Sequence, residues 1–117
     1  MAYMLLVIEP PGQRSTRTDA EGREVYARMV RFSEELKQRG LLTMSQSLKS
    51  DAAGARVKVR EDSVMITDGP FAETKEVMGG FFLLTCNTRE QAIAIARECP
   101  AAQWATIEVR ELGPCFA

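Results

Sequence analysis

The densest group of ionisable side chains lies in residues 67–76, which read Thr-Asp-Gly-Pro-Phe-Ala-Glu-Thr-Lys-Glu. Asp68, Glu73 and Glu76 supply three carboxylates, and Lys75 supplies an ammonium group. At the rim of a cavity, a carboxylate can act as a general base. A neighbouring ammonium group can hold an anion or keep a carboxylate ionised. Asp68, Glu73, Lys75 and Glu76 are therefore the candidate catalytic residues.

The same segment has two other interpretations. Asp-Gly-Pro is typical of a turn, in which Asp68 would cap backbone N–H groups while Glu73, Lys75 and Glu76 stay in water. Alternatively, the oxygens of Asp68, Glu73 and Glu76 suit a hard cation. The residue types alone leave all three interpretations open.

Glycine, proline and phenylalanine beside these charges extend the candidate site. Phe71 offers an apolar anchor after the Gly69-Pro70 turn, and Gly79-Gly80 interrupts the most hydrophobic segment, residues 77–86. Paired glycines within a strand indicate a bulge or the close approach of another group to the backbone. The candidate ligand-binding residues are Asp68, Gly69, Pro70, Phe71, Lys75, Gly79 and Gly80.

Composition limits the chemistry. The chain has no histidine, which excludes Ser-His and Cys-His nucleophile pairs within one chain. Its three cysteines, Cys86, Cys99 and Cys115, are too widely spaced for a CxxC motif. Cys99 ends an expected helix, where the helix dipole disfavours a thiolate, so we interpret it as core filling. We assign no cofactor and no metal ligands, and the hard-cation site is the least favoured of the three interpretations of residues 67–76.

The charge balance and the number of cysteines predict the kind of partner and the cellular location of the protein. Fifteen basic and sixteen acidic residues are intermixed along the chain, which argues against a nucleic-acid partner. The apolar start, residues 3–8, has no basic flank and is followed by Glu9, so it reads as a strand and not as a leader. An odd number of cysteines is typical of reduced thiols. We expect a cytoplasmic protein with no membrane contact.

The hydrophobic pattern predicts one domain over residues 1–117. Thr18 and Glu21 have the spacing of a capping box that opens a helix near Asp19, and Arg39-Gly40 closes it. Residues 13–18 are expected to be a mobile loop. The other expected elements are strands at 3–8, 41–48, 77–86 and 106–110, a hairpin at 57–66, and a helix from 88 to 99.

This order is strand, helix, strand, hairpin, strand, helix, strand. Without the hairpin it is the split β-α-β pattern of an α+β, ferredoxin-like fold, with both helices on one face of an antiparallel sheet. The opposite face would expose a large apolar patch that no further segment is left to cover. We therefore expect a homodimer in which two sheets pack face to face.

Residues 68–76, DGPFAETKE, resemble the defining motif of the DGPF family within the YCII-related superfamily. Residues 32–36, 79–82 and 107–110 are similar to other shared stretches of that family. The resemblance implies a dimeric ferredoxin-like α/β-barrel with the motif loop near a cleft between helix and sheet. It also implies a regulatory protein partner, because some members are encoded beside sigma factors.

The chain departs from the superfamily at one point. YCII relatives carry a His-Asp pair proposed as a catalytic dyad, with the Asp before a Pro at the end of the second helix. Here there is no histidine, and Cys99 precedes Pro100. The dyad mechanism cannot be carried over.

The residues and the resemblance together lead to two candidate functions. The first is a homodimeric small-molecule-binding or interaction domain, to which the resemblance adds an accessory role in sigma-factor regulation. The alternative is a cofactor-free enzyme with hydrolase-like or lyase-like acid–base chemistry, carried by the carboxylates of the DGPFAETKE loop.

Overall fold

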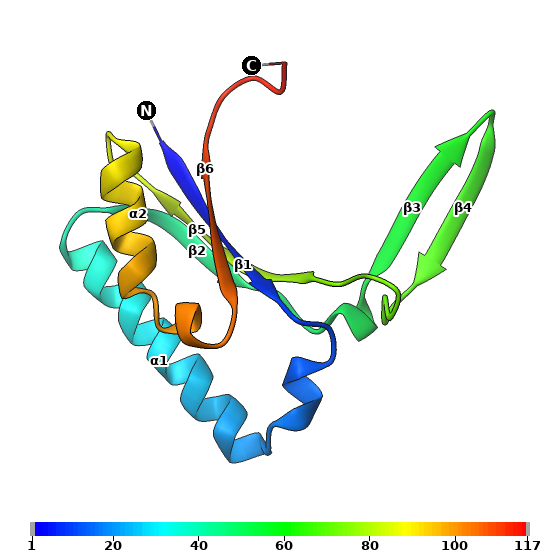
Figure 1. Cartoon of the computed structure of the whole chain (residues 1–117), viewed down its shortest axis with the longest axis horizontal. Helices are drawn as coiled ribbons and strands as arrows, with labels where there is room; N and C mark the ends of the chain where they lie inside the picture. Colours follow the sequence, from blue (N-terminus) through cyan, green and yellow to red (C-terminus); the bar gives the residue numbers. More distant parts are fainter. Residues whose placement is uncertain (1, 117) are drawn as a thin grey trace.

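The computed structural model describes residues 2–116 as a four-stranded antiparallel sheet, two α-helices and a separate hairpin (Figure 1). This α+β architecture is the predicted one. The strands are β1 (Tyr3–Glu9), β2 (Leu42–Ser47), β3 (Ala55–Arg60), β4 (Ser63–Asp68), β5 (Val77–Leu84) and β6 (Thr106–Glu111). The α-helices are α1 (Asp19–Gln38) and α2 (Arg89–Glu98), and short 3-10 helices lie at Gln13–Thr16, Asp51–Ala53 and Pro100–Gln103.

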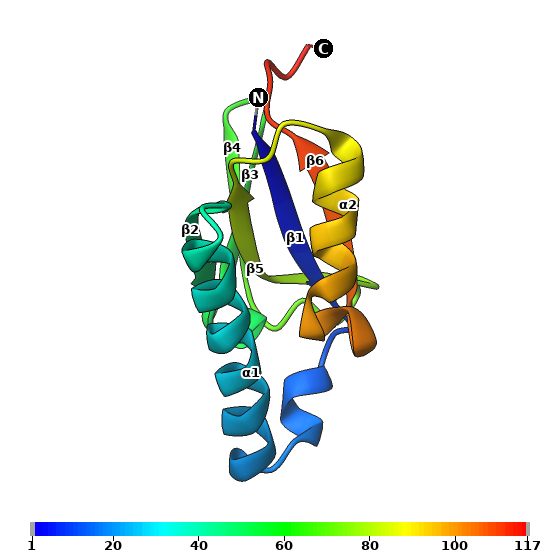
Figure 2. The ribbon, with the colours of Figure 1, turned by 90° about the vertical axis from the view of Figure 1, so that its left-hand side faces the viewer.

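The sheet has the order β2-β5-β1-β6, and every neighbouring pair is antiparallel. This arrangement is consistent with a ferredoxin-like fold, and both helices lie on the same side of the sheet (Figure 2). Burial alternates along β1, as expected where only one face is covered. Neither helix in residues 2–116 is long and apolar enough to cross a membrane.

The core lies between the helices and the covered sheet face. Leu5 from β1, Leu36 from α1 and Leu84 from β5 have no exposed surface. The rings of Phe32 and Phe82 meet edge to face, with centroids 5.4 Å apart, a geometry that aromatic pairs prefer. On α1, the buried side chains are Phe32 and Leu36, both in its C-terminal half. The N-terminal half of α1 is therefore less tightly packed on the sheet.

The predicted ends of α1 are confirmed. The Thr18 hydroxyl accepts a hydrogen bond from the Glu21 N–H, and the Thr18 N–H donates to the Glu21 carboxylate at 2.8 Å. The hydrogen bond from the Thr18 N–H to the carboxylate is the main cause that lowers the pKa of Glu21. At the other end, Gly40 has a φ of 72°, the left-handed conformation that glycine adopts most easily.

The two glycines of β5 form a bulge, one of the alternatives that the sequence predicts. Val7 pairs with Gly80 and Ile8 with Met78, which leaves Gly79 without a partner in the ladder. A Cβ at Gly79 would overlap Glu9 Oε1, and a Cβ at Gly80 would lie 2.8 Å from the carbonyl oxygen of Gln46. Only glycine fits at Gly79 without displacing the Glu9 carboxylate.

The loop expected at residues 13–18 is corrected by the structure, because most of this segment is helical. Residues Gln13–Thr16 form a 3-10 helix, which is fixed by a side chain that the loop prediction ignored. Arg14 from this turn forms an ion pair with Glu9 and donates hydrogen bonds to the carbonyl oxygens of Leu48 and Gly79. Arg14 thus links this segment to β1, to the end of β2 and to β5.

β3 and β4 form a hairpin that stands away from the sheet, on the side opposite the helices (Figures 1 and 2). We call residues 55–68 the arm. Glu61 and Asp62 form its tip with φ values of 50° and 66°, as in the two-residue turns typical of hairpins. Four apolar side chains of the arm are 54–67% exposed: Val57, Val59, Val64 and Ile66.

The exposed methionines correct a further expectation. From their hydropathy, the methionines at positions 4, 29, 44, 65 and 78 are expected to fill the core. Met44, Met65 and Met78 are instead 45–48% exposed in the single chain. Met65 lies on the arm, and Met44 and Met78 lie on strands of the sheet. Hydropathy alone does not tell a core position from an apolar position on an uncovered surface.

We predict that Gly79→Ala lowers the free energy of unfolding by about 1–3 kcal/mol, because the new methyl group overlaps a carboxylate that the ion pair holds in place. Urea unfolding followed by circular dichroism measures this change. Gly22→Ala is the control: a Cβ at Gly22 meets nothing within 4 Å, so the change should stabilise α1 by about 1 kcal/mol. Equal stability of the two variants would contradict the close approach at Gly79.

Candidate functional site

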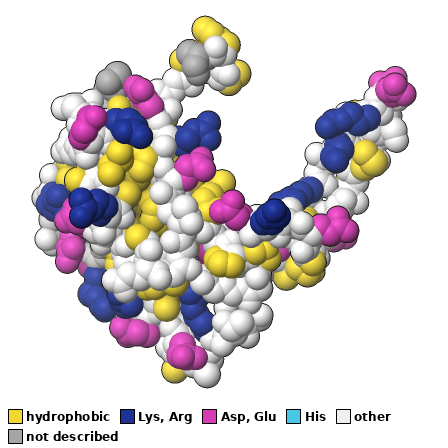
Figure 3. Space-filling view, viewed as in Figure 1, with side chains coloured by type: hydrophobic (Ala, Val, Ile, Leu, Met, Phe, Trp, Pro, Cys, Tyr) yellow, Lys and Arg dark blue, Asp and Glu magenta, His cyan; other side chains and the backbone are white. Residues whose placement is uncertain are grey.

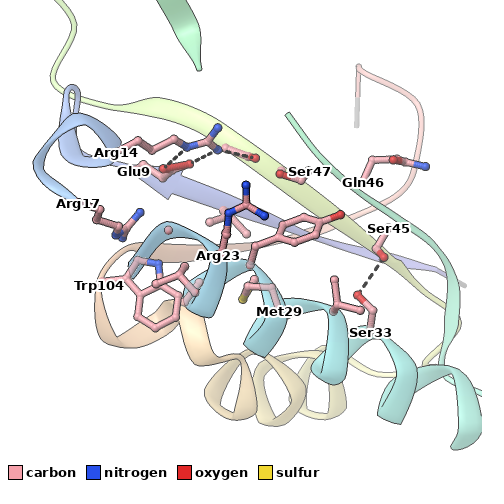
Figure 4. Close-up of a pocket in the computed structure, with 18 of the residues that line it drawn as sticks. Glu9, Arg14, Arg17, Arg23, Met29, Ser33, Ser45, Gln46, Ser47 and Trp104 are labelled. Carbon is pink, nitrogen blue, oxygen red and sulfur yellow. Dashed lines mark hydrogen bonds and ion pairs between the residues drawn. The ribbon is translucent and has the colours of Figure 1, made fainter. Parts of the chain in front are cut away.

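A cleft with a volume of about 880 Å³ lies between α1 and the sheet (Figure 4). The N-terminal half of α1 forms one wall, β5 and the end of β2 form the other, and Trp104 lies at one end. The cleft exists because no side chain in this half of α1 is buried against the sheet. Its volume is in the range of small-molecule sites.

An ion pair forms part of the cleft wall. The Arg14 guanidinium binds the Glu9 carboxylate through two hydrogen bonds, Nη2 to Oε1 at 2.7 Å and Nε to Oε2 at 3.1 Å. It also donates to the carbonyl oxygens of Leu48 at 2.6 Å and Gly79 at 3.1 Å. The Glu9 side chain is only 8% exposed. The hydrogen-bonding capacity of Arg14 is thus used to hold a buried carboxylate and two strand ends.

Two further arginines line the cleft. The guanidinium carbon of Arg17 lies 5.8 Å from the centroid of the Trp104 ring, and within residues 2–116 Arg17 forms no ion pair. Arg23 forms an ion pair with Asp19 at 2.8 Å, in which both side chains are more than 80% exposed. Exposed pairs of this kind contribute little to stability. Both guanidinium groups are therefore open to other partners.

Hydroxyl groups line a different part of the cleft. Ser33 from α1 and Ser45 from β2 lie 3.0 Å apart, at hydrogen-bond distance (Figure 4). Ser47 and Gln46 of β2 also line this part. Polar groups thus lie on both sides of an apolar stretch that includes Met29.

The structure places the sequence-predicted site residues in different surroundings. Gly79 and Gly80 are buried and line the cleft, whereas the four candidate catalytic residues, Asp68, Glu73, Lys75 and Glu76, are exposed and do not. Pro70 lines a second, smaller pocket of about 480 Å³, which Glu9 and Arg14 also border. Asp68, Gly69, Phe71 and Lys75 border neither cavity. The charged loop and the cleft are separate in the single chain.

The motif loop is built into the base of the arm. The Phe71 N–H donates to the Asp51 carboxylate at 2.9 Å, and the Arg56 guanidinium lies 4.1 Å from the centroid of the Phe71 ring. The Phe71 anchor predicted from the sequence is thus half-buried under Arg56. The carboxylate that accepts this backbone hydrogen bond is that of Asp51, and not that of Asp68, which pairs with Ala55 at the end of the hairpin.

Acidic and cysteine side chains do not gather at one point. Among residues 2–116, no three His, Cys, Asp or Glu side chains lie close enough to share a metal ion. Cys86 and Cys99 are each 2% exposed, and Cys115 is exposed. Burial raises the pKa of the Cys99 thiol and of the Cys86 thiol, so both favour the neutral form. The interpretation of Cys99 as core filling agrees with this burial.

Sequence reasoning missed the cleft arginines. Arg14 and Arg17 lie in a polar stretch without periodicity, so no local signal marks them. In the structure, Glu9 continues the inward alternation of Tyr3, Leu5 and Val7, which places a carboxylate on the buried face. Because residues 3–8 are all apolar, the sequence does not show which alternate set faces inward. A buried carboxylate requires a partner, and Arg14 is the first cation that follows it in the chain.

Comparisons with known proteins place this chain. A family model of the YCII-related domain matches residues 1–115. The chain belongs to the YCII-related family. This YCII-related chain is also 29% identical over 114 residues to an uncharacterized protein of Rhizobium meliloti (strain 1021). That similarity covers 96% of this chain and 92% of the relative.

We predict that only one of the three thiols of the YCII-related chain reacts rapidly with Ellman's reagent in the folded state. Cys115 is exposed, whereas burial both shields Cys86 and Cys99 and raises their pKa values. Absorbance at 412 nm follows the reaction. In Cys115→Ser the rapid phase should vanish, and a rapid phase that persists would show that a buried thiol is accessible.

Proposed function

We propose that this YCII-related protein is a small-molecule-binding domain that works as a homodimer and holds its ligand in the cleft between α1 and the sheet. The observation that carries the proposal is the cleft itself, about 880 Å³ of space beside a half-helix that is not packed on the sheet. Val25, Met29 and Phe82 offer apolar wall, and a few polar groups converge on the same space. This combination is typical of ligand sites.

The homodimer would cover the second face of the sheet. On that face, Met4, Leu6 and Ile8 of β1 and Phe81 and Leu83 of β5 are partly exposed. A second copy offers the same apolar surface, and a two-fold axis brings identical patches together. Removing apolar surface from water contributes about 25 cal/mol per Å².

The arm supports the same partner. Its apolar side chains Val57, Val59, Val64 and Ile66 are exposed, and an isolated two-stranded hairpin is marginally stable in water. The arm and the body of the molecule enclose an open hollow on the side away from the helices (Figure 3). A second copy in this hollow would contact the uncovered sheet face and the arm together.

Membership of the DGPF subgroup and an accessory role in sigma-factor regulation belong to this proposal and rest on the DGPFAETKE resemblance. A cytoplasmic setting fits the three unpaired cysteines.

The enzyme alternative requires the second subunit to shelter the motif loop, because Asp68, Glu73, Lys75 and Glu76 are exposed in one chain. Acid–base catalysis by those residues stays a prediction.

We predict that the protein sediments as a dimer of about twice 13.0 kDa at micromolar concentration. Leu83→Glu, which places a charge on the uncovered face, should convert it to a monomer with unchanged helical circular dichroism. Val57→Glu on the arm is a second variant with the same expected direction.

Ala94→Glu is the matched control, since Ala94 is exposed on α2, on the helix side of the sheet. It should leave the dimer intact. A wild-type protein that sediments as a monomer would contradict the dimer, and so would an unchanged dimer in both Leu83→Glu and Val57→Glu.

We predict that the neutral dye Nile red enters the cleft and quenches the emission of Trp104, the one tryptophan of the sequence, by energy transfer. Gly22→Leu should weaken binding by about fivefold or more, because Gly22 borders the cleft and its substituent projects into open space. Ala94→Leu adds the same side chain on α2 and should leave the affinity unchanged. Equal affinities of all three proteins would place the dye outside the cleft.

A further inference from the structure

We propose that the ligand of the cleft is a small organic anion, with an apolar body and a carboxylate or phosphate group that Arg17 and Arg23 bind. This inference rests on the proposed function and names the chemical class of its ligand. It starts from the charges that line the cleft.

The cleft has the opposite charge sign to the whole chain. Arg14, Arg17 and Arg23 contribute three positive charges to its lining, and Glu9 and Asp19 contribute two negative charges, a balance of +1. The complete chain has a net charge of −1. A concave, partly apolar site concentrates such a local potential and attracts ions of the opposite sign.

The three arginines differ in what they can still bind. Arg14 donates its hydrogen bonds to Glu9 and to two carbonyl oxygens, so its charge is neutralised within the cleft wall. It does not account for the excess positive charge of the cleft. In the described part of the chain, the Arg17 guanidinium donates no hydrogen bond and forms no ion pair. The unmatched positive charge of the cleft therefore lies on Arg17.

Arg17 is also held in position. Its guanidinium carbon lies 5.8 Å from the Trp104 ring centroid, and that of Arg28 lies 5.1 Å from it. A cation over an aromatic face is stabilised through that face, while its N–H groups stay free for a planar acceptor. Carboxylate and phosphate groups are the acceptors that match a guanidinium group.

Arg23 can supply the second contact. Its side chain extends from α1 across the cleft (Figure 4), and its pair with Asp19 is solvent-exposed. An exposed pair contributes about 0–1 kcal/mol, so exchanging Asp19 for a ligand anion costs little. Arg17 lies immediately before the α1 N-cap Thr18 and Arg23 lies in the second turn of α1, and both line the same cleft.

The other residues that line the cleft indicate the chemistry of the remainder of the ligand. Met29 and Phe82 offer apolar surface beyond the arginines, and Ser33 and Ser45 offer hydroxyl groups. A bare inorganic anion would leave most of the 880 Å³ unfilled. An organic acid with an apolar body uses both the cations and the apolar wall.

The test compares acids with a neutral molecule of the same shape. Benzoate, phenyl phosphate and benzamide are titrated into the full-length protein, and Trp104 emission, excited at 295 nm, reports binding beside Arg17. We expect benzoate or phenyl phosphate to bind at least about tenfold more tightly than benzamide, because charge-assisted hydrogen bonds form only with the anions. Which of the two anions binds more tightly distinguishes a carboxylate from a phosphate ligand.

Variants assign the effect to the two arginines. In Arg17→Gln with Arg23→Gln, the advantage of the anions over benzamide should vanish while benzamide affinity stays unchanged. Each single variant should lose part of the advantage, which keeps the test usable if the double variant does not fold. Arg97→Gln, an exposed arginine of α2 outside the cleft, removes the same charge and should behave as wild type.

Three outcomes would overturn the inference: equal binding of benzamide and the anions, an anion advantage that survives in the double variant, or no response of Trp104 to any anion. Nile red separates this failure from that of the proposed function. If the dye binds in the cleft but the anions have no advantage, the binding site stands and its anionic ligand does not. If neither the dye nor any anion binds, both proposals fail.

Discussion

The ion pair between the buried Glu9 carboxylate and the partly exposed Arg14 organises this molecule at the end of its sheet where the cleft opens. A carboxylate on the inward face of β1 would be costly to bury alone, so its place in the fold depends on the bidentate guanidinium. The same guanidinium holds the carbonyl oxygens of Leu48 and Gly79. One cation thereby fixes the ends of β1 and β2 and the bulge of β5, and Gly79 leaves the space that the carboxylate needs.

The cleft follows from how unevenly α1 is packed. Phe32 and Leu36 seat the C-terminal half of the helix in the core, whereas the N-terminal half carries no buried side chain. The Thr18 cap stabilises that half through its own hydrogen bonds, so it keeps its helical form without support from the sheet. The capped end of α1 lies beside the sheet end that Arg14 holds by hydrogen bonds, and the space between them can accept a ligand.

The fold was largely predictable because its signals are local. The continuous apolar run of residues 3–8, the Thr18–Glu21 box, Arg39-Gly40 and the paired glycines of β5 each indicate a conformation within a few residues. The cleft was not predictable in this way. Arg17 meets Trp104 across 87 positions of sequence, and Phe71 meets Asp51 across 20, so no spacing pattern links them. The density of charges in the DGPFAETKE motif suggested a catalytic site, yet the contacts that Phe71 makes with Asp51 and Arg56 hold the base of the arm.

The arm connects to the rest of the chain at its base, where the Gly69 N–H donates to the Gly54 carbonyl oxygen at 2.8 Å and Arg56 lies over the Phe71 ring. The residues on either side of the arm lie next to each other in space. A change within the arm therefore does not shift the register of the strands in the four-stranded sheet. The length and side chains of the arm can therefore diverge among descendants of one ancestral chain without disturbing the core. Evolution can thus change the surface that the arm offers to a partner while the cleft between α1 and the sheet is preserved.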